Sequence, residues 1–265
     1  MGLALYTTRS STLVLIADSG SHRIRSFDTT STEVASFAGT GIPGLYDGAT
    51  KSCLFHSPEG VTADGNGLVF VADTGSNAIR LIEHGSVRTL AGGSLAASYP
   101  VNGQGTNAVF SSPSALALEM DASNNAVILY VVDVGFHCIR TVALDGSVTT
   151  FAGSPFGKNG FIDGPAAASL FHFSPVGSGL LLLDGNLLVS DFGNHALRLV
   201  TGGAVRTFFG ASGSDWEDES FTLKAPVGLA QERDGTLYIA DFGAHKVFKR
   251  VEGPCPYVCV PTQAH

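Results

Sequence analysis

The chain has 265 residues, of which 44% are hydrophobic, 14% are charged and 33 are glycine. This composition excludes a disordered chain, and its many short apolar stretches that end in Gly, Asp, Asn or Ser predict an all-β protein. The formal net charge of -8, from 15 basic and 23 acidic residues, argues against a nucleic-acid partner because such a chain repels phosphate.

The first elements are a strand at residues 3–6 and an apolar strand, LVLIAD, that ends at Asp18. This second strand recurs as GLVFVAD, LYVVD, NLLVSD and TLYIAD, and the intervals between the final Asp residues are 55, 60, 58 and 50 residues. The recurring residues are Asp18, Asp73, Asp133, Asp191 and Asp241, followed two positions later by Gly20, Gly75, Gly135, Gly193 and Gly243. Each Asp-x-Gly predicts a hairpin turn, in which the carboxylate accepts N–H groups of the turn and Gly provides a positive φ.

A third strand follows each turn. The residue six positions after Asp is aliphatic, and the residue seven positions after it is Arg25, Arg80, Arg140, Arg198 or, in the last copy, Phe248. The strand period of two predicts the aliphatic side chain on the buried face and Arg on the other.

A fourth strand is expected next, with the sequence EVASFAG, SVRTLAG, SVTTFAG or AVRTFFG. A glycine-rich connection follows it. Each connection leads to a proline, Pro58, Pro113, Pro175 or Pro226, after which the first strand of the next unit is expected. A unit of four strands is too small to bury both of its faces alone. The repeat therefore predicts a radial stack of blades, a β-propeller.

These residues resemble the NHL-repeat family of β-propellers, whose signature joins a Pro-x-Gly-aliphatic first strand to a strand ending in Asp and an Asn/His-x-Ile-Arg segment. The resemblance extends from about Leu3 to Val260. It implies a single propeller over residues 1–265, with blades at approximately 3–41, 58–93, 113–154, 175–211 and 226–260. Propellers of this family usually have six blades, so either the five visible blades close or a sixth lies in further sequence.

Histidine or asparagine occupies the position four residues after each Asp: His22, Asn77, His137, His195 and His245. Equivalent residues of neighbouring blades would lie on the order of 15 Å apart, too far to share one zinc ion, so structural roles are expected. His56 and His172 precede the innermost strands, with Ser112 and Lys224 at comparable places in other blades. Some related propellers, such as lyases and lactonase-type hydrolases, bind zinc or calcium near the central channel. No cofactor is predicted here, and zinc or calcium at His56 and His172 is the alternative.

The acidic run DWEDE, residues 215–219, lacks the ligand order of a calcium-binding loop and is expected to be a solvated connection. Its Asp215 and Trp216, together with His56 and His172, are candidate contact residues for a ligand.

The four cysteines show no zinc spacing. Free thiols are expected, and a disulfide between Cys255 and Cys259 is the alternative.

The sequence contains no recognisable catalytic motif, so the leading hypothesis is a non-catalytic propeller that binds a protein or peptide through loops on the channel face. A metal-dependent lyase or hydrolase is the competing hypothesis, and RNA binding is a third. No apolar run reaches the roughly 18 to 20 residues that cross a bilayer, so no membrane span is expected. The absence of a leader pattern favours the cytoplasm, with an extracellular domain of a larger protein as the alternative.

Overall fold

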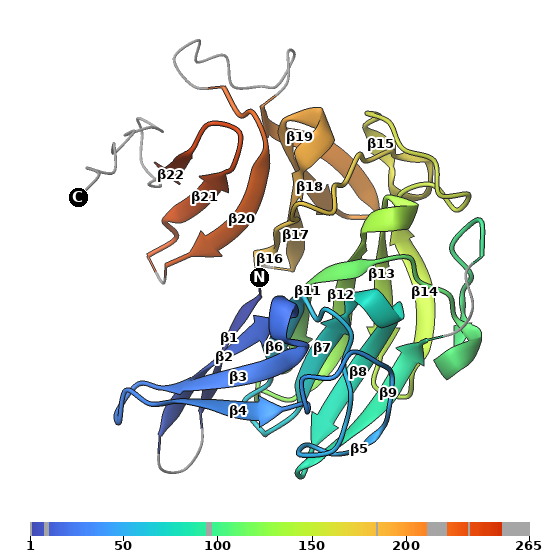
Figure 1. Cartoon of the computed structure of the whole chain (residues 1–265). Coiled ribbons are helices and arrows are strands. Elements are labelled where there is room, and N and C mark those ends of the chain that lie inside the picture. Colours follow the sequence, from blue (N-terminus) through green and yellow to red (C-terminus); the bar gives the residue numbers. More distant parts are fainter. Residues whose placement is uncertain are drawn as a thin grey trace. The chain divides into compact units, whose positions relative to one another are not determined.

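The apolar segments that end in Asp form strands because their alternating side chains pack on both faces of a sheet. In the computed structural model these are β2 (Thr12–Asp18), β7 (Val69–Asp73), β12 (Ala126–Asp133), β17 (Asn186–Asp191) and β21 (Leu237–Asp241). The structure describes residues 2–7, 11–93, 97–183, 185–210, 222–232 and 234–250. The fold is an all-β propeller type with five antiparallel sheets, each containing one of these strands (Figure 1).

Three sheets belong to a first compact unit, Met1–Phe151 with Pro155–Lys158. The first sheet has the order β1 (Leu3–Thr7), β2, β3 (Arg23–Asp28) and β4 (Val34–Ala38). The second has the order β6 (Gly60–Ala63), β7, β8 (Ala78–Glu83), β9 (Ser86–Gly92) and β5 (Gly48–Ala49). The third has the order β11 (Pro113–Met120), β12, β13 (Cys138–Ala143), β14 (Ser147–Ala152) and β10 (Gly103–Gln104).

The second unit, Ala152–Ser154 with Asn159–His265, contains the other two sheets. The fourth sheet has the order β16 (Leu180–Leu183), β17, β18 (Ala196–Thr201), β19 (Ala204–Gly210) and β15 (Gly164–Pro165). The fifth, within the described residues, has the order β20 (Pro226–Gln231), β21 and β22 (Lys246–Arg250). Residues 251–260 of the expected fifth blade lie outside the described residues.

The described residues also form six short 3-10 turns: η1 (Ser19–Ser21), η2 (Thr74–Ser76), η3 (Gly105–Asn107), η4 (Val134–Phe136), η5 (Ala166–Ala168) and η6 (Phe192–Asn194). In the described ranges, no helix has the length and apolarity to span a membrane.

Two features differ from the sequence prediction. Sheets two to four carry a fifth strand, because the two-residue strands β5, β10 and β15 of the incoming connections pair with β9, β14 and β19. The fourth sheet also begins later than Pro175, at Leu180, since Ser174 and Gly177 first form an isolated bridge.

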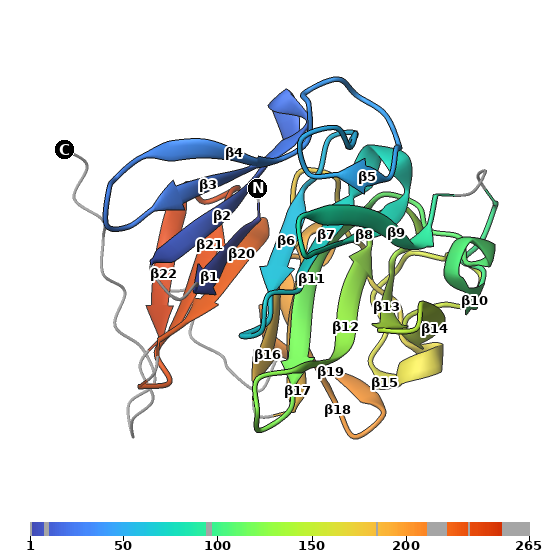
Figure 2. The same cartoon turned by 90° about the horizontal axis from the view of Figure 1, so that it is seen from below.

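The core lies between consecutive sheets of the same unit, whose inner strands β1, β6 and β11 are adjacent in the first unit (Figure 2). Leu15, Ile24, Phe55 and Val71 fill the space between the first and second sheets. Phe70, Ile79, Phe110 and Leu129 fill the space between the second and third. In the second unit, Leu188, Leu197, Phe209, Leu237 and Ile239 form the core. Sheets that are buried on both faces leave their ends and connections for function.

Candidate functional site

The Asp-x-Gly segment links the second and third strands of every sheet, and we call this end of each sheet the turn end. In the first four sheets, a three-residue 3-10 turn follows the Asp. The next residue has left-handed backbone: His22 (φ 53°), Asn77 (φ 51°), His137 (φ 49°) and His195 (φ 56°), as does His245 (φ 54°) in the fifth sheet. The prediction of a positive φ at the motif glycine is therefore wrong. Asn and His take this conformation more readily than most residues with a side chain.

The motif glycine is instead required by close packing. A Cβ atom at Gly75 would lie 2.6 Å from the carbonyl oxygen of His56, and one at Gly193 would lie 2.5 Å from Nδ1 of His172. In the first sheet, the equivalent position at Gly20 has no atom within 4 Å. The glycine thus admits the incoming connection, and at Gly20 the described residues leave open space.

The motif Asp pairs with the Arg seven residues later. Nη1 of the arginine lies 2.9 Å from Oδ2 of the aspartate in Arg80–Asp73, 3.3 Å in Arg140–Asp133 and 2.7 Å in Arg198–Asp191, and all six side chains are fully buried. The prediction that Arg lies on the less buried face is wrong, because both faces of these sheets are covered and the carboxylate compensates the charge.

The incoming connection completes the arginine site. Arg80 donates to the carbonyl oxygens of Leu54 (2.9 Å) and Tyr46 (3.0 Å) and to the carboxylate of Asp47 (2.7 Å). The ring centroid of Phe55 lies 5.2 Å from its guanidinium carbon. The third sheet repeats this arrangement with Val109, Val101, Asn102 and Phe110 around Arg140, and the fourth with Leu170, Ile162, Asp163 and Phe171 around Arg198. We call residues 46–56, 101–111 and 162–172 the cover segments.

The cover segments share one spacing. Asp or Asn is followed eight residues later by Phe (47 to 55, 102 to 110, 163 to 171), and the next residue donates its backbone N–H to the motif Asp. These N–H groups belong to His56 (2.7 Å to Asp73), Ser111 (2.8 Å to Asp133) and His172 (2.7 Å to Asp191). The residue equivalent to His56 in the third sheet is therefore Ser111, and not Ser112 as expected. The hydrophobic pattern did not predict the cover segments, although the spacing of Asp or Asn to Phe was visible in the sequence.

Burial controls the ionisation of the motif aspartates. Desolvation raises the pKa of Asp133 to about 7, and it outweighs the opposing effect of Arg140. Burial also raises the pKa of Asp73 and of Asp191. In the first sheet, the hydrogen bond from Arg25 lowers the pKa of Asp18, whose side chain is partly exposed.

The candidate histidines lie at the turn end of their sheets, and the rings of both His56 and His172 are exposed. The rings of His56 and His22 meet edge to face, with their centroids 5.7 Å apart. Nδ1 of His22 accepts the N–H of Ser57 at 3.0 Å, and Oδ1 of Asn77 accepts that of Ser112 at 2.7 Å. These contacts give the position four residues after Asp a structural role in the first two sheets.

In the part of the chain that the structure describes, no group of three or more His, Cys, Asp or Glu side chains is placed to hold a metal ion. Cys53 and Cys138 are buried free thiols. Asp215, Trp216, Cys255 and Cys259 lie outside the described residues.

Large apolar side chains are exposed on the connections. In the first unit these are Ile42 (63% exposed), Leu45, Tyr46 (61%), Tyr99 and Phe156 (70%). In the second unit, Phe161 and Ile162 lie on a connection, and Phe242 lies in the last Asp-x-Gly turn. The connections therefore present aromatic surface from a framework of hydrogen-bonded sheets.

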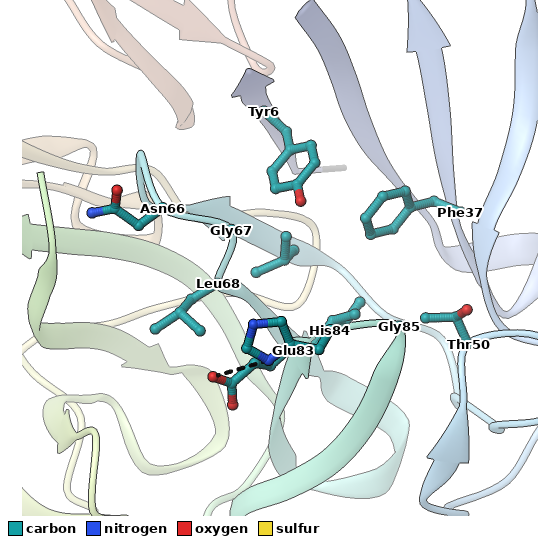
Figure 3. Close-up of a pocket in the computed structure, with 11 residues that line it drawn as sticks. Tyr6, Phe37, Thr50, Asn66, Gly67, Leu68, Glu83, His84 and Gly85 are labelled. Atoms are coloured by element: carbon teal, nitrogen blue, oxygen red, sulfur yellow. Dashed lines mark ion pairs between the residues drawn. The ribbon is translucent and has the colours of Figure 1, made fainter. Parts of the chain in front are cut away.

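A pocket of about 370 Å³ lies at the opposite end of the first and second sheets (Figure 3). Tyr6 and Phe37 enter it from β1 and β4, with ring centroids 5.7 Å apart. Its other side is formed by Leu68 and by the turn that carries Glu83 and His84, whose Nδ1 lies 3.6 Å from the carboxylate.

Two curated proteins resemble the chain over most of its length. Protein SUPPRESSOR OF QUENCHING 1, chloroplastic, of Arabidopsis thaliana is 27% identical over 232 residues, which cover 82% of this chain and 22% of that protein. NHL repeat-containing protein 2 of Homo sapiens is 29% identical over 266 residues, which cover 88% of this chain and 36% of that protein. The chain thus matches 22% and 36% of the length of these two relatives. No family model matches the chain.

Solved structures share the fold at low sequence identity. An auxiliary nutrient binding protein from Bacteroides thetaiotaomicron has a TM-score of 0.63 and 12% identity, covering 92% of this chain and 58% of that chain. A chain of a nidogen/laminin complex has a TM-score of 0.60 and 16% identity, covering 95% and 75%. A protein described as a gluconolactonase has a TM-score of 0.57 and 14% identity, covering 99% and 77%. At these identities, the likeness shows the fold alone.

Proposed function

Since the chain is an NHL-type β-propeller, we propose that it is a non-catalytic scaffold that binds a protein or peptide through the loops at the turn end of its sheets. The observation that carries the proposal is the exposure of Ile42, Tyr46, Tyr99 and Phe156 on the connections. Tyrosine and phenylalanine are enriched at the centres of protein interfaces, where they bury large areas with little loss of conformational entropy.

The framework beneath these loops supports the proposal. Buried pairs such as Arg80–Asp73 and the bonds from Arg80 to Leu54 and Tyr46 fix each connection at several points. A loop that is held in place before binding loses less conformational entropy when it binds. More of the free energy from its aromatic contacts therefore appears as binding affinity. Structures that share this fold include a nutrient binding protein and a member of a protein complex.

The experiment compares two exposed faces of the first unit. A partner obtained with the chain as bait is purified and titrated against the double variant Tyr46→Ser/Tyr99→Ser and against Met120→Ser. Tyr46, Tyr99 and Met120 are all exposed, but Met120 ends β11 at the opposite end of its sheet. We expect at least a tenfold loss of affinity for the double variant and none for Met120→Ser. Equal affinity for all three proteins would contradict the proposed face.

A metal-dependent lyase or hydrolase with its site at the central channel is the second proposal, and the exposure of its two candidate ligands, His56 and His172, favours it. Zinc enzymes use three protein ligands, and the described residues here offer two. The test is the thermal unfolding midpoint of the chain and of His56→Ala with and without zinc or calcium. A metal-dependent rise that His56→Ala abolishes would support the metal site, and no rise in either protein would refute it.

A further inference from the structure

Three Asn-Gly pairs occur in the chain, at residues 66–67, 102–103 and 159–160. In such a pair, the backbone nitrogen of the glycine can attack the side-chain carbonyl carbon of the asparagine, because glycine has no Cβ atom to hinder the approach or to restrict the backbone. The attack requires a glycine N–H that is free of other hydrogen bonds and a backbone that can bend. The structure separates the three pairs by these requirements.

The first pair, Asn66 and Gly67, lies in the turn that joins β6 to β7, at the end of the second sheet opposite its turn end. Asn66 is exposed. Among the described residues, the N–H of Gly67 donates no backbone hydrogen bond. Gly67 has a φ of 107°, which residues with a side chain rarely adopt, so this turn requires a glycine directly after Asn66. The turn therefore places an available backbone nitrogen next to the amide.

The other two pairs are held in place by their surroundings. Gly160 donates its N–H to the carbonyl oxygen of Phe171 at 3.0 Å. Gly103 belongs to β10, whose two residues pair with β14. The side chain of Asn102 is bound by Arg140 at 3.0 Å. In both pairs, the connection must first leave its bonded position before the nitrogen can attack.

The amide group of Asn66 joins two sheets. Its Nδ2 donates to the third sheet, to Oδ1 of Asn125 at 2.8 Å and to the carbonyl oxygen of Asn124 at 3.2 Å. The N–H of Gly65 donates to the same carbonyl oxygen at 3.2 Å. In Figure 3, the amide of Asn66 points away from Tyr6. The β6–β7 turn of the second sheet is thus bonded to the β11–β12 turn of the third, and the amide nitrogen is the main donor.

We propose that Asn66-Gly67 is a site of spontaneous deamidation, and that the reaction releases the β6–β7 turn from the β11–β12 turn. The nitrogen of Gly67 loses its proton and attacks Cγ of Asn66, the Cγ–Nδ2 bond breaks, and ammonia leaves as a succinimide ring forms. Water then opens the ring at either carbonyl group, which gives aspartate or isoaspartate at position 66. Neither product carries the amide donor.

The product does not suit its surroundings. A carboxylate at position 66 faces the oxygen atoms of Asn124 and Asn125, which have lost the hydrogen-bond donor that the amide supplied. Isoaspartate also lengthens the backbone by a methylene group, which displaces the turn. The net charge of the chain changes by one unit, from -8 to -9, because a neutral amide becomes a carboxylate. The site lies away from the turn end, so this inference goes beyond the proposed binding function and does not depend on it.

The test follows all three pairs in the folded chain during incubation at mildly alkaline pH. Each pair falls in a different tryptic peptide, and mass spectrometry with fragmentation measures the conversion of asparagine to acid in each; the peptides are 52–80, 89–140 and 159–198. We expect Asn66 to convert at least about tenfold faster than Asn102 or Asn159, because only the last two must first break the bonds of their connections. In urea, where the fold is absent, the three rates should become similar.

Asn66→Gln is the matched chemical control, because glutamine keeps the amide but its longer side chain would have to form a larger ring. Anion exchange should show an early acidic form of the wild-type chain that is absent from this variant. Conversion of Asn102 or Asn159 as fast as that of Asn66 in the folded chain would overturn the site. No conversion of Asn66 in the folded chain, over a time in which the chain in urea converts, would also overturn it.

The effect on the fold is measured with Asn66→Asp, which makes one product directly. We expect its thermal unfolding midpoint to fall by about 2–4 °C, the shift that the loss of one or two hydrogen bonds produces in a chain of this size. Asn107→Asp is the matched control, because Asn107 is exposed in the first unit and the change adds the same charge; its midpoint should shift by less than about 1 °C. Equal midpoints for the two variants would overturn the release of the turn.

Discussion

His22 and Asn77 each perform two tasks in one residue. Both have left-handed backbone, and both use a side-chain acceptor, Nδ1 or Oδ1, for the N–H of Ser57 or Ser112 in the next connection. In the fourth sheet the side-chain role differs, since Nδ1 of His195 lies against the carbonyl oxygen of Lys224 and donates to it. The acceptor role of Nδ1 also places the proton of a neutral His22 on Nε2.

Gly75→Ala should destabilise the protein, and Gly20→Ala should not. The Cβ atom at position 75 would meet the His56 carbonyl oxygen at 2.6 Å, which forces the connection outward, whereas position 20 has open space. We expect a loss of about 1–3 kcal/mol for Gly75→Ala and a change within about 1 kcal/mol for Gly20→Ala, measured by urea unfolding. Equal losses would show that the glycine serves the turn itself and not the approach of the connection.

Asp133 predicts a pH dependence of stability. Burial raises its pKa to about 7 in the folded protein, above its ordinary value of 3.8, so the folded state holds a proton that the unfolded state has released between these values. The stability contributed by this group is therefore lost as the pH rises towards 7. Relative to Asp133→Asn, the wild type should lose on the order of 1 kcal/mol in free energy of unfolding between pH 6 and 7, and little more between pH 7.5 and 8.5. A constant difference between the two proteins from pH 6 to 8.5 would contradict the raised pKa.

At the scale of the element, the cover segment joins a loop to the sheet that it enters. Asp163 binds Nη2 of Arg198 at 2.6 Å and the N–H of Thr207 at 2.8 Å, so one carboxylate connects β18 and β19 to the connection. The sequence predicted a glycine-rich connection that leads to Pro175, but it did not identify Asp163 and Phe171 as parts of one binding unit. Their role depends on contacts between segments about 35 residues apart, which hydrophobic periodicity does not report.

Arg198→Gln should be far more destabilising than Arg25→Gln. Removal of Arg198 leaves the Asp191 carboxylate buried without its charge partner and breaks the bonds to Leu170 and Ile162. We expect a loss of about 3–5 kcal/mol for Arg198→Gln and less than about 1 kcal/mol for the partly exposed Arg25→Gln, from urea unfolding. A small loss for Arg198→Gln would mean that the buried pair adds little beyond its own desolvation cost.

At the scale of the molecule, the sequence predicted the five sheets because their period, the strands ending in Asp and the Ala-Gly strand ends repeat along the whole chain. It did not predict the edge strands β5, β10 and β15, because two residues are too few to show an alternating pattern.

The candidate residues Asp215 and Trp216 lie outside the described residues and stay predictions. Asp215 stands nine residues before Lys224, which is also the spacing from Asp47 to His56. Asp215 is therefore a candidate for a structural role in the fifth sheet, as an alternative to contact with a ligand.

Net charge is a property of the whole chain, and it predicts how the chain meets a polyanion. Only 15 residues are basic against 23 acidic ones, and Arg80, Arg140 and Arg198 are buried in ion pairs and cannot reach a phosphate. We expect the chain to pass through a heparin column at 50 mM salt, because counterion release needs several accessible cations that act together. The charge-reversal variant Glu33→Lys/Glu83→Lys serves as the control for sensitivity, since it adds cations to the first unit and should be retained more strongly. Retention of the wild type, with elution that shifts steeply with salt, would contradict the protein or peptide partner and restore RNA as a candidate.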